Sequence, residues 1–133
     1  MATIFTEILN GALPCHKVFE DDRHLAFLEP SPIAPGHTVV LPKRETDHFF
    51  DLDDRELADL VIFAKKVAVA LRQAVPCRKV AVIVYGMVVR HAHIHLIPAQ
   101  GDPRELYLTN ARPAGPDELE RHAGRIRSFL PDA

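Results

Sequence analysis

The sequence predicts a single α+β domain, in which about five antiparallel strands form a sheet and helices pack on it. The 133 residues, 47% hydrophobic and 26% charged, have the size and balance of one globular domain. The strands expected near the N-terminus follow one another without helices between them, which excludes the parallel βαβ order. A long amphipathic helix and a strand of alternating histidines and apolar residues complete the pattern. We therefore expect residues 1–133 to form one domain.

Short elements open the chain. The apolar residues within 4–9 have the spacing of a short amphipathic helix. Residues 16–22 and 24–29 then predict two strands of a hairpin, which an acidic turn closes. Residues 30–36 hold three prolines and a glycine and predict a loop, and residues 37–43 predict a third strand.

The second half of the chain contains the longest helix signal, over residues 53–75, with an aspartate to cap its start. The β-branched run of 79–85 predicts a central strand that is covered on both faces. Residues 91–98, HAHIHLIP, predict the last strand, which its final proline ends. Residues 101–116 have no regular pattern, and 116–130 predict a terminal helix. The expected packing face of that helix consists of Leu119, Ile126, Phe129 and Leu130.

Composition excludes several classes of partner. The net charge of −2 gives no basic surface for nucleic acid. No apolar run approaches the roughly 20 residues that span a bilayer, and the N-terminus lacks the basic region of a secretory signal. Cys15 and Cys77 are isolated in the sequence and predict reduced thiols. We expect a cytoplasmic protein without nucleic-acid or membrane partners.

Three histidines at alternate positions, His91, His93 and His95, are the most informative feature of the sequence. Successive side chains on a strand point to opposite faces, so the three imidazoles are expected on one face, toward solvent or a cleft. The outer pair would be about 13 Å apart at Cα, too far to share one metal ion. The opposite face is expected to join the core through Ala92, Ile94 and Leu96.

This pattern allows more than one chemistry. Two alternate histidines could bind zinc, with His37 or His48 as a third ligand. Alternatively, a neutral imidazole is itself a good nucleophile near neutral pH, and its histidine neighbours can supply hydrogen bonds or protons to an anionic group. A solvated histidine face without a role is the third possibility.

The motif HAHIHLI, together with IFTEILNGALPCHKVFEDDRHLAFLEPSPIAPGHTVVLPK, resembles the histidine triad (HIT) family, in particular its nucleotide-binding proteins. The resemblance covers roughly residues 3–98 and implies a HIT-like fold with one long helix and short terminal helices. It also implies a nucleotide hydrolase or transferase that acts at the α-phosphate of phosphoramidates, nucleotidyl esters or dinucleoside polyphosphates. By this resemblance His93 is the nucleophile, His95 binds phosphate oxygens, and His91 with His37 relays protons to the leaving group.

The resemblance also assigns a nucleotide pocket. Phe5, Ile8, Leu13 and Phe27 match the apolar residues that enclose a purine. Glu29 stands where the family often has an aspartate on the ribose hydroxyls, and its longer carboxylate can still accept two hydrogen bonds.

Two departures from the family pattern change the expected chemistry. Before the triad, the short segment YGMVVRH places Met87 and Val88 where many members contact phosphate through glutamine, serine or threonine. Thr3, Thr6 and Glu45 replace the two cysteines and the histidine with which some members bind structural zinc, and these are poor zinc ligands. We therefore expect a metal-independent enzyme without a cofactor.

Two other functions stay open from the sequence, namely a nucleotide-binding module with little turnover and a two-histidine zinc-dependent hydrolase. A homodimer is also expected, because the long helix and the strand at 79–85 have more apolar surface than one core needs. The resemblance supports this expectation, since family members pair two sheets edge to edge. The residues that spread apolar surface around the helix are Val61, Ile62, Phe63, Val67 and Val69.

Overall fold

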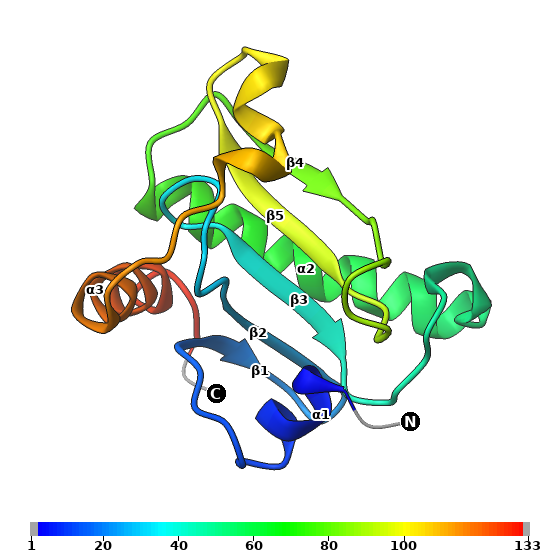
Figure 1. The fold of residues 1–133 in the computed structure, drawn as a ribbon. Coiled ribbons are helices and arrows are strands. Elements are labelled where there is room, and N and C mark those ends of the chain that lie inside the picture. Colours follow the sequence, from blue (N-terminus) through cyan, green and yellow to red (C-terminus); the bar gives the residue numbers. More distant parts are fainter. Residues whose placement is uncertain (1–2, 132–133) are drawn as a thin grey trace.

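The computed structural model describes residues 3–131 and has the expected α+β architecture (Figure 1). Its sheet has the strand order β1-β2-β3-β5-β4, and all neighbouring strands are antiparallel. Two 3-10 turns, at 103–106 and 108–110, interrupt the irregular segment before the last helix. The elements are α1 (Ile4–Leu9), β1 (Lys17–Glu20), β2 (His24–Leu28), β3 (Thr38–Pro42), α2 (Asp54–Ala74), β4 (Lys79–Ile83), β5 (Ile94–Ala99) and α3 (Pro116–Arg127).

The two faces of the sheet are covered differently. Helix α2 lies along one face, with α3 beside it (Figure 1), and the main core lies between these helices and the sheet. On the opposite face, the short helix α1 packs Phe5 against the sheet. The buried residues of this second cluster are Phe5, Leu25, Phe27, Val39 and Leu41.

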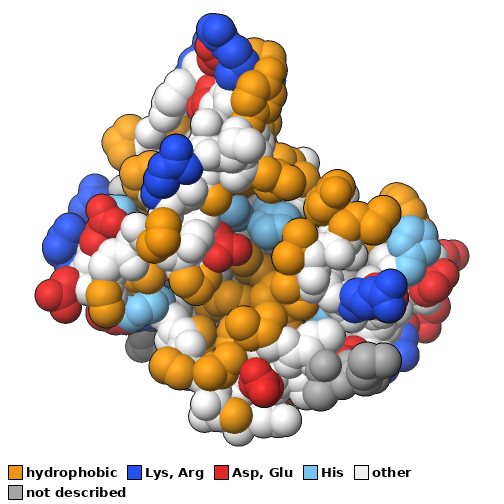
Figure 2. All heavy atoms as spheres, in the orientation of Figure 1, with side chains coloured by type: hydrophobic (Ala, Val, Ile, Leu, Met, Phe, Trp, Pro, Cys, Tyr) orange, Lys and Arg blue, Asp and Glu red, His pale blue; other side chains and the backbone are white. Residues whose placement is uncertain are grey.

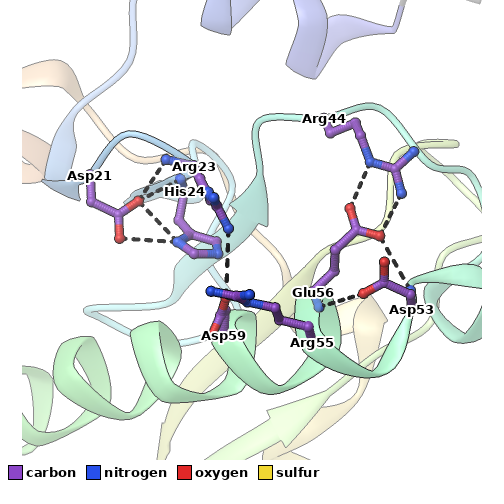
Figure 3. A network of polar contacts seen from close by, with 8 residues as sticks. All are labelled: Asp21, Arg23, His24, Arg44, Asp53, Arg55, Glu56 and Asp59. Carbon is purple, nitrogen blue, oxygen red and sulfur yellow. Dashed lines mark hydrogen bonds and ion pairs between the residues drawn. The ribbon is translucent and has the colours of Figure 1, made fainter.

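A polar network fixes the start of α2 (Figure 3). The Asp53 carboxylate accepts the Glu56 backbone N–H at 2.8 Å, and the Glu56 carboxylate accepts the Asp53 N–H at 3.3 Å. The Arg44 guanidinium donates to both oxygens of Glu56, at 2.6 and 2.7 Å. The backbone carbonyl of Thr46, which follows closely after Arg44, accepts the backbone N–H of Ala92 at 2.6 Å. The network therefore ties the segment of Arg44 and Thr46 to the start of α2, and this segment hydrogen-bonds the histidine motif at Ala92.

The strand β4 is at the edge of the sheet, so the predicted central position was wrong. Its β-branched residues indicated a covered strand, but Val82 has 62% of its surface exposed. The exposed apolar residues Val61, Ile62 and Val69 lie on α2. Within residues 3–131, no helix is long and apolar enough to cross a membrane.

The last strand begins at Ile94, three residues later than expected, and continues through Pro98 to Ala99. Pairing with β3 ends at Leu96, and Pro98 pairs with β4 alone. The proline can therefore lie inside the strand. In α3, Leu119 and Ile126 are buried as expected, whereas Phe129 lies past the last turn of the helix and is exposed.

Candidate active site

A cavity of about 290 Å³ opens on the face of the sheet opposite α2. Figure 2 shows this hollow, with hydrophobic side chains on its floor and histidine and acidic side chains beside them. Helix α1, the loop before β3, the β4–β5 connection and the segment around Leu108 form its walls. Of the residues assigned from the sequence, the cavity brings together Phe5, Ile8, Phe27, Glu29, His37, His93 and His95.

The histidine segment alternates between the two faces even before β5 begins. The side chains of Ala92, Ile94 and Leu96 are buried in the core on the α2 side, as the sequence predicts. His93 and His95 line the cavity on the other side. The expectation of three histidines facing a cleft therefore holds for two of them.

His37 reaches the same cavity from the loop before β3. Gly36 has a φ of 89°, and a Cβ at this position would lie 2.9 Å from the Val75 side chain. Only glycine fits this turn, because the left-handed backbone and the close approach to α2 both exclude a side chain. The tight turn places His37 at the start of β3, opposite β5.

Three imidazoles form a continuous hydrogen-bonded chain in this cavity. His93 Nε2 lies 3.1 Å from His95 Nε2, and His95 Nδ1 lies 2.9 Å from His37 Nε2. Backbone groups anchor both ends of the chain. His93 Nδ1 is 2.6 Å from the carbonyl oxygen of His91, and the backbone N–H of Ile33 donates to His37 Nδ1 at 3.1 Å.

These backbone anchors assign the hydrogen on every ring when the imidazoles are neutral. The His91 carbonyl can only accept, so Nδ1 of His93 carries the hydrogen and Nε2 keeps its lone pair. His95 therefore donates from Nε2 to His93, and His37 donates from Nε2 to His95. The Ile33 N–H requires the lone pair of His37 Nδ1, which agrees with this assignment. The arrangement leaves a nucleophilic nitrogen at His93 Nε2.

Burial keeps these imidazoles neutral. Burial, together with a smaller contribution from the neighbouring triad imidazoles, lowers the pKa of His37 to about 3 and that of His95 to about 4. Burial also lowers the pKa of His93, although its hydrogen bond to the His91 carbonyl acts in the opposite direction. Near neutral pH the empty site therefore contains three uncharged histidines.

His91 has a different environment from the other two histidines of the motif. Its side chain is fully buried and does not line the cavity. Its Nε2 donates to the Pro42 carbonyl oxygen at 2.7 Å, whereas its Nδ1 has no hydrogen-bond partner among residues 3–131. The contact with His93 is made by the backbone carbonyl of His91, and His37 contacts His95 directly.

The nucleotide-pocket residues are also mostly together. Phe5 packs edge-on against Phe27 and His93, with ring centroids 5.7 and 4.9 Å apart. Glu29 accepts the Ser31 backbone N–H at 3.1 Å, and burial raises the pKa of its carboxyl group. Leu13 lies outside the cavity and is 36% exposed. Apolar lining residues that the sequence analysis did not assign are Ile4, Ile33, Ile83, Val88, Val89, Ile97 and Leu108.

Two groups of residues bear on metal binding. Glu29, His37 and His95 offer ligand atoms that all lie within 4.8 Å of one another. A metal on His37 Nε2 would move the hydrogen to Nδ1, against the Ile33 N–H, so the hydrogen-bond pattern opposes it. At the positions that match the family's structural zinc, the Thr6 hydroxyl donates to Glu45 at 3.3 Å and caps α1 together with Thr3. Two hydroxyls and a carboxylate do not fit zinc.

The fold and this arrangement of histidines define the class of histidine triad domains. The family model of the HIT domain matches residues 10–102, and the chain belongs to this family. A Schizosaccharomyces pombe adenosine 5′-monophosphoramidase is 31% identical over 98% of this chain and 99% of its own. An uncharacterised HIT-like protein of Methanocaldococcus jannaschii is 32% identical over 87% of this chain and 94% of its own.

Solved structures show the same fold. A HIT-like protein of Bartonella henselae superposes with a TM-score of 0.85 at 29% identity and covers 96% of both chains. A hypothetical histidine triad nucleotide-binding protein of Sulfolobus tokodaii gives a TM-score of 0.85 at 27% identity, over 95% of this chain and 90% of its own.

Proposed function

We propose that this protein is a cytoplasmic, metal-independent hydrolase that cleaves nucleotides at the α-phosphorus through a nucleotidyl-His93 intermediate. Nucleoside phosphoramidates are the leading substrate class, with nucleotidyl esters and dinucleoside polyphosphates as the other two. The observation that carries the proposal is that the hydrogen bond from Nδ1 to the His91 carbonyl leaves a lone pair on Nε2 of His93, a residue that lines the apolar cavity. The activity named for the S. pombe relative supports the leading class.

The first half of the reaction transfers the nucleotidyl group to His93. An incoming phosphate anion favours the charged form of nearby imidazoles, so binding lets His95 take up a proton. His93 Nε2 then attacks the phosphorus, the bond from phosphorus to the leaving nitrogen breaks, and the His95 imidazolium gives its proton to the departing amine. The charged His95 donates from Nδ1 to His37 Nε2, 2.9 Å away, so the hydrogen of His37 moves to its Nδ1 at the expense of the bond from the Ile33 N–H.

The second half releases the product. Water enters where the amine has left, and neutral His95 takes one of its protons as the oxygen attacks the phosphorus. The bond from phosphorus to Nε2 breaks and returns its electron pair to His93. The products are the amine and a nucleoside monophosphate, and His95 gives up its proton to solvent when the monophosphate leaves.

The same cavity supports nucleoside binding. The rings of Phe5 and Phe27, with Ile8 beside them, offer an apolar slot for a purine. The Glu29 carboxylate can accept hydrogen bonds from the two ribose hydroxyls. These hydroxyls would replace water around the negative charge of Glu29, which burial disfavours. In this assignment His91 supports the nucleophile through its carbonyl, His95 carries the proton, and His37 is the hydrogen-bond partner of His95.

A homodimer is part of the proposal. The supporting features are the exposed apolar side chains of Val61, Ile62 and Val69 on α2 and of Val82 on the edge strand β4. Such surface is a liability in water unless it is covered, and an open strand edge can pair with a second copy. Multi-angle light scattering at micromolar concentration should give twice the chain mass of 14.9 kDa. A monomer mass would contradict the proposal.

A substrate panel with intact-mass detection tests the function. The purified protein should release monophosphate from an adenosine phosphoramidate, and rapid acid-free quenching should trap a species heavier by one nucleotidyl group. Binding without turnover of any panel member would favour the nucleotide-binding module instead. Activity should survive a chelator, and a rate that is lost on chelation and restored by zinc would favour the zinc-dependent hydrolase.

A further inference from the structure

A second cavity, of about 440 Å³, lies against the connection between β4 and β5. The segment before α2 supplies one of its walls and residues 84–90 supply the other. His93, Tyr85 and Gly86 border both this cavity and the one that contains the imidazole chain. We call this second space the leaving-group cleft, lined principally by His48, Phe49, Phe50, Tyr85, Met87 and Arg90.

Large apolar side chains gather at the cleft although they are in contact with solvent. Phe50 is 74% exposed, Met87 75% and Tyr85 55%. The Phe50 ring is nonetheless packed, edge-on against Phe49 and His48, with centroids 5.4 and 5.9 Å apart. An exposed apolar patch that borders a reactive side chain is a binding surface rather than an ordinary part of the exterior.

The charges at the cleft oppose each other. Arg90 and Asp47 both line it, and no ion pair is recorded for either within residues 3–131. A strongly anionic leaving group would meet one cation and one carboxylate there, with little net electrostatic gain. The aromatic and thioether surfaces are therefore the features that can discriminate between leaving groups.

We propose that this cleft binds the leaving group and selects an uncharged aromatic group over a second nucleotide. The inference rests on the proposed function. In phosphoryl transfer the attacking and leaving atoms lie roughly in line through phosphorus, so the leaving group points away from His93 Nε2 and out of the nucleoside cavity, which continues into the cleft at Tyr85 and Gly86. The cleft is the adjoining space that shares His93 with that cavity. Selectivity is set by contacts with Phe50, Tyr85 and Met87.

The test compares adenosine 5′-phosphoramidates of phenethylamine and propylamine, two primary alkyl amines, in the full-length protein. The ratio of their kcat/KM values should favour the aromatic compound. Phe50→Ala should reduce that ratio about two- to twelvefold, since an aromatic contact is worth about 0.5–1.5 kcal/mol. Phe129→Ala is the matched control, because Phe129 is also exposed but lines neither cavity, and it should leave the ratio unchanged.

A second arm tests the charge argument. A dinucleoside triphosphate should be a poorer substrate than the phenethyl compound, and Asp47→Asn should narrow that difference by removing the carboxylate.

The outcomes separate the two proposals. If neither phosphoramidate releases monophosphate, the proposed function fails and this inference fails with it. If both are cleaved but Phe50→Ala leaves their ratio unchanged, only this inference is overturned. This inference is also overturned if Phe50→Ala weakens dimerisation without changing the ratio. That result would mean that a second copy of the chain, and not the leaving group, covers the cleft.

Discussion

The two faces of the sheet use apolar residues for different purposes. On the α2 face, a helix of 21 residues and α3 pack against the strands, with residues such as Leu60, Val67 and Leu71 fully buried. On the opposite face, α1 has only six residues, and the loops around it leave a cavity of about 290 Å³. The first face supplies most of the hydrophobic stabilisation of the fold. The second face keeps apolar surface accessible in the cavity, where a ligand can cover it.

This difference predicts that the two faces respond oppositely to substitution. Residues of the hollow face are expected to change binding and rate with little loss of stability, and residues of the filled face are expected to do the reverse. Stability and site chemistry can then be separated by measurement on the same set of variants.

The largest effect is expected for His93→Ala. Removing the bond-forming nitrogen should lower turnover of an adenosine phosphoramidate by several orders of magnitude, while nucleotide affinity stays within about tenfold because the apolar cavity is unchanged. Quenched time-course assays measure the turnover, and calorimetric titration with a nucleoside monophosphate measures the affinity. His122→Ala, which removes an imidazole outside this cavity, should keep wild-type turnover. A His93→Ala rate within tenfold of wild type would sink the assignment.

The next largest effect is expected for Leu60→Ala on the filled face. Leu60 is fully buried against the sheet, so the change should reduce the free energy of unfolding by about 2–5 kcal/mol and leave kcat near wild type. Leu108→Ala, on the rim of the hollow face, should change stability by less than about 0.5 kcal/mol and weaken nucleotide binding. Urea unfolding and binding titrations on both variants make the comparison. Equal stability losses would contradict the division between the faces.

A smaller effect concerns pH. His37 and His95 have pKa values lowered to about 3 and about 4 in the folded protein, below the unfolded value of about 6.5. Between these values the unfolded chain binds more protons, so stability rises with pH. The histidine contribution is fully present above about pH 6.5 and is lost as pH falls toward the folded pKa values. The acid limb of kcat/KM should likewise lie below the ordinary histidine value, since these groups stay neutral in the free protein.

Urea midpoints between pH 7 and pH 4 measure this dependence. His37→Asn keeps an acceptor for the Ile33 N–H and should flatten the slope, whereas His48→Asn, at an exposed histidine, should not. Identical slopes in all three proteins would show that the buried histidines do not set the acid response.

The smallest effect is expected for Arg44→Ala. The Arg44–Glu56 pair is well aligned but fully exposed, so its loss should cost little stability. Thermal unfolding should show a small decrease, and the difference from wild type should shrink in high salt. A loss comparable with that of Leu60→Ala would mean that the segment carrying Thr46 is essential to the histidine segment.

Sequence patterns predicted the fold class and the elements well, because alternation and helical spacing report which residues are buried. They failed for the position of β4. β-branched residues suit a central strand, but they suit equally well an edge strand that another surface can cover. They also failed for His91, because period-two alternation gives the face of a side chain but not its burial at the end of a strand. The histidine motif and the resemblance located His37, yet Leu108 lacks any local signal, since only tertiary packing brings it to the cavity.

The direction of the hydrogen bonds in the imidazole chain determines when the nucleophile becomes available, as well as which ligands can react with it. In the empty protein the hydrogen of His95 Nε2 occupies the lone pair of His93, so the nucleophile is capped by its own neighbour. Only a ligand with an acceptor strong enough to attract that hydrogen, such as a phosphate oxygen, uncovers the nitrogen. Neutral electrophiles that diffuse into the cavity find the His93 nitrogen hydrogen-bonded and unreactive. The negative charge of the substrate itself releases the nucleophile.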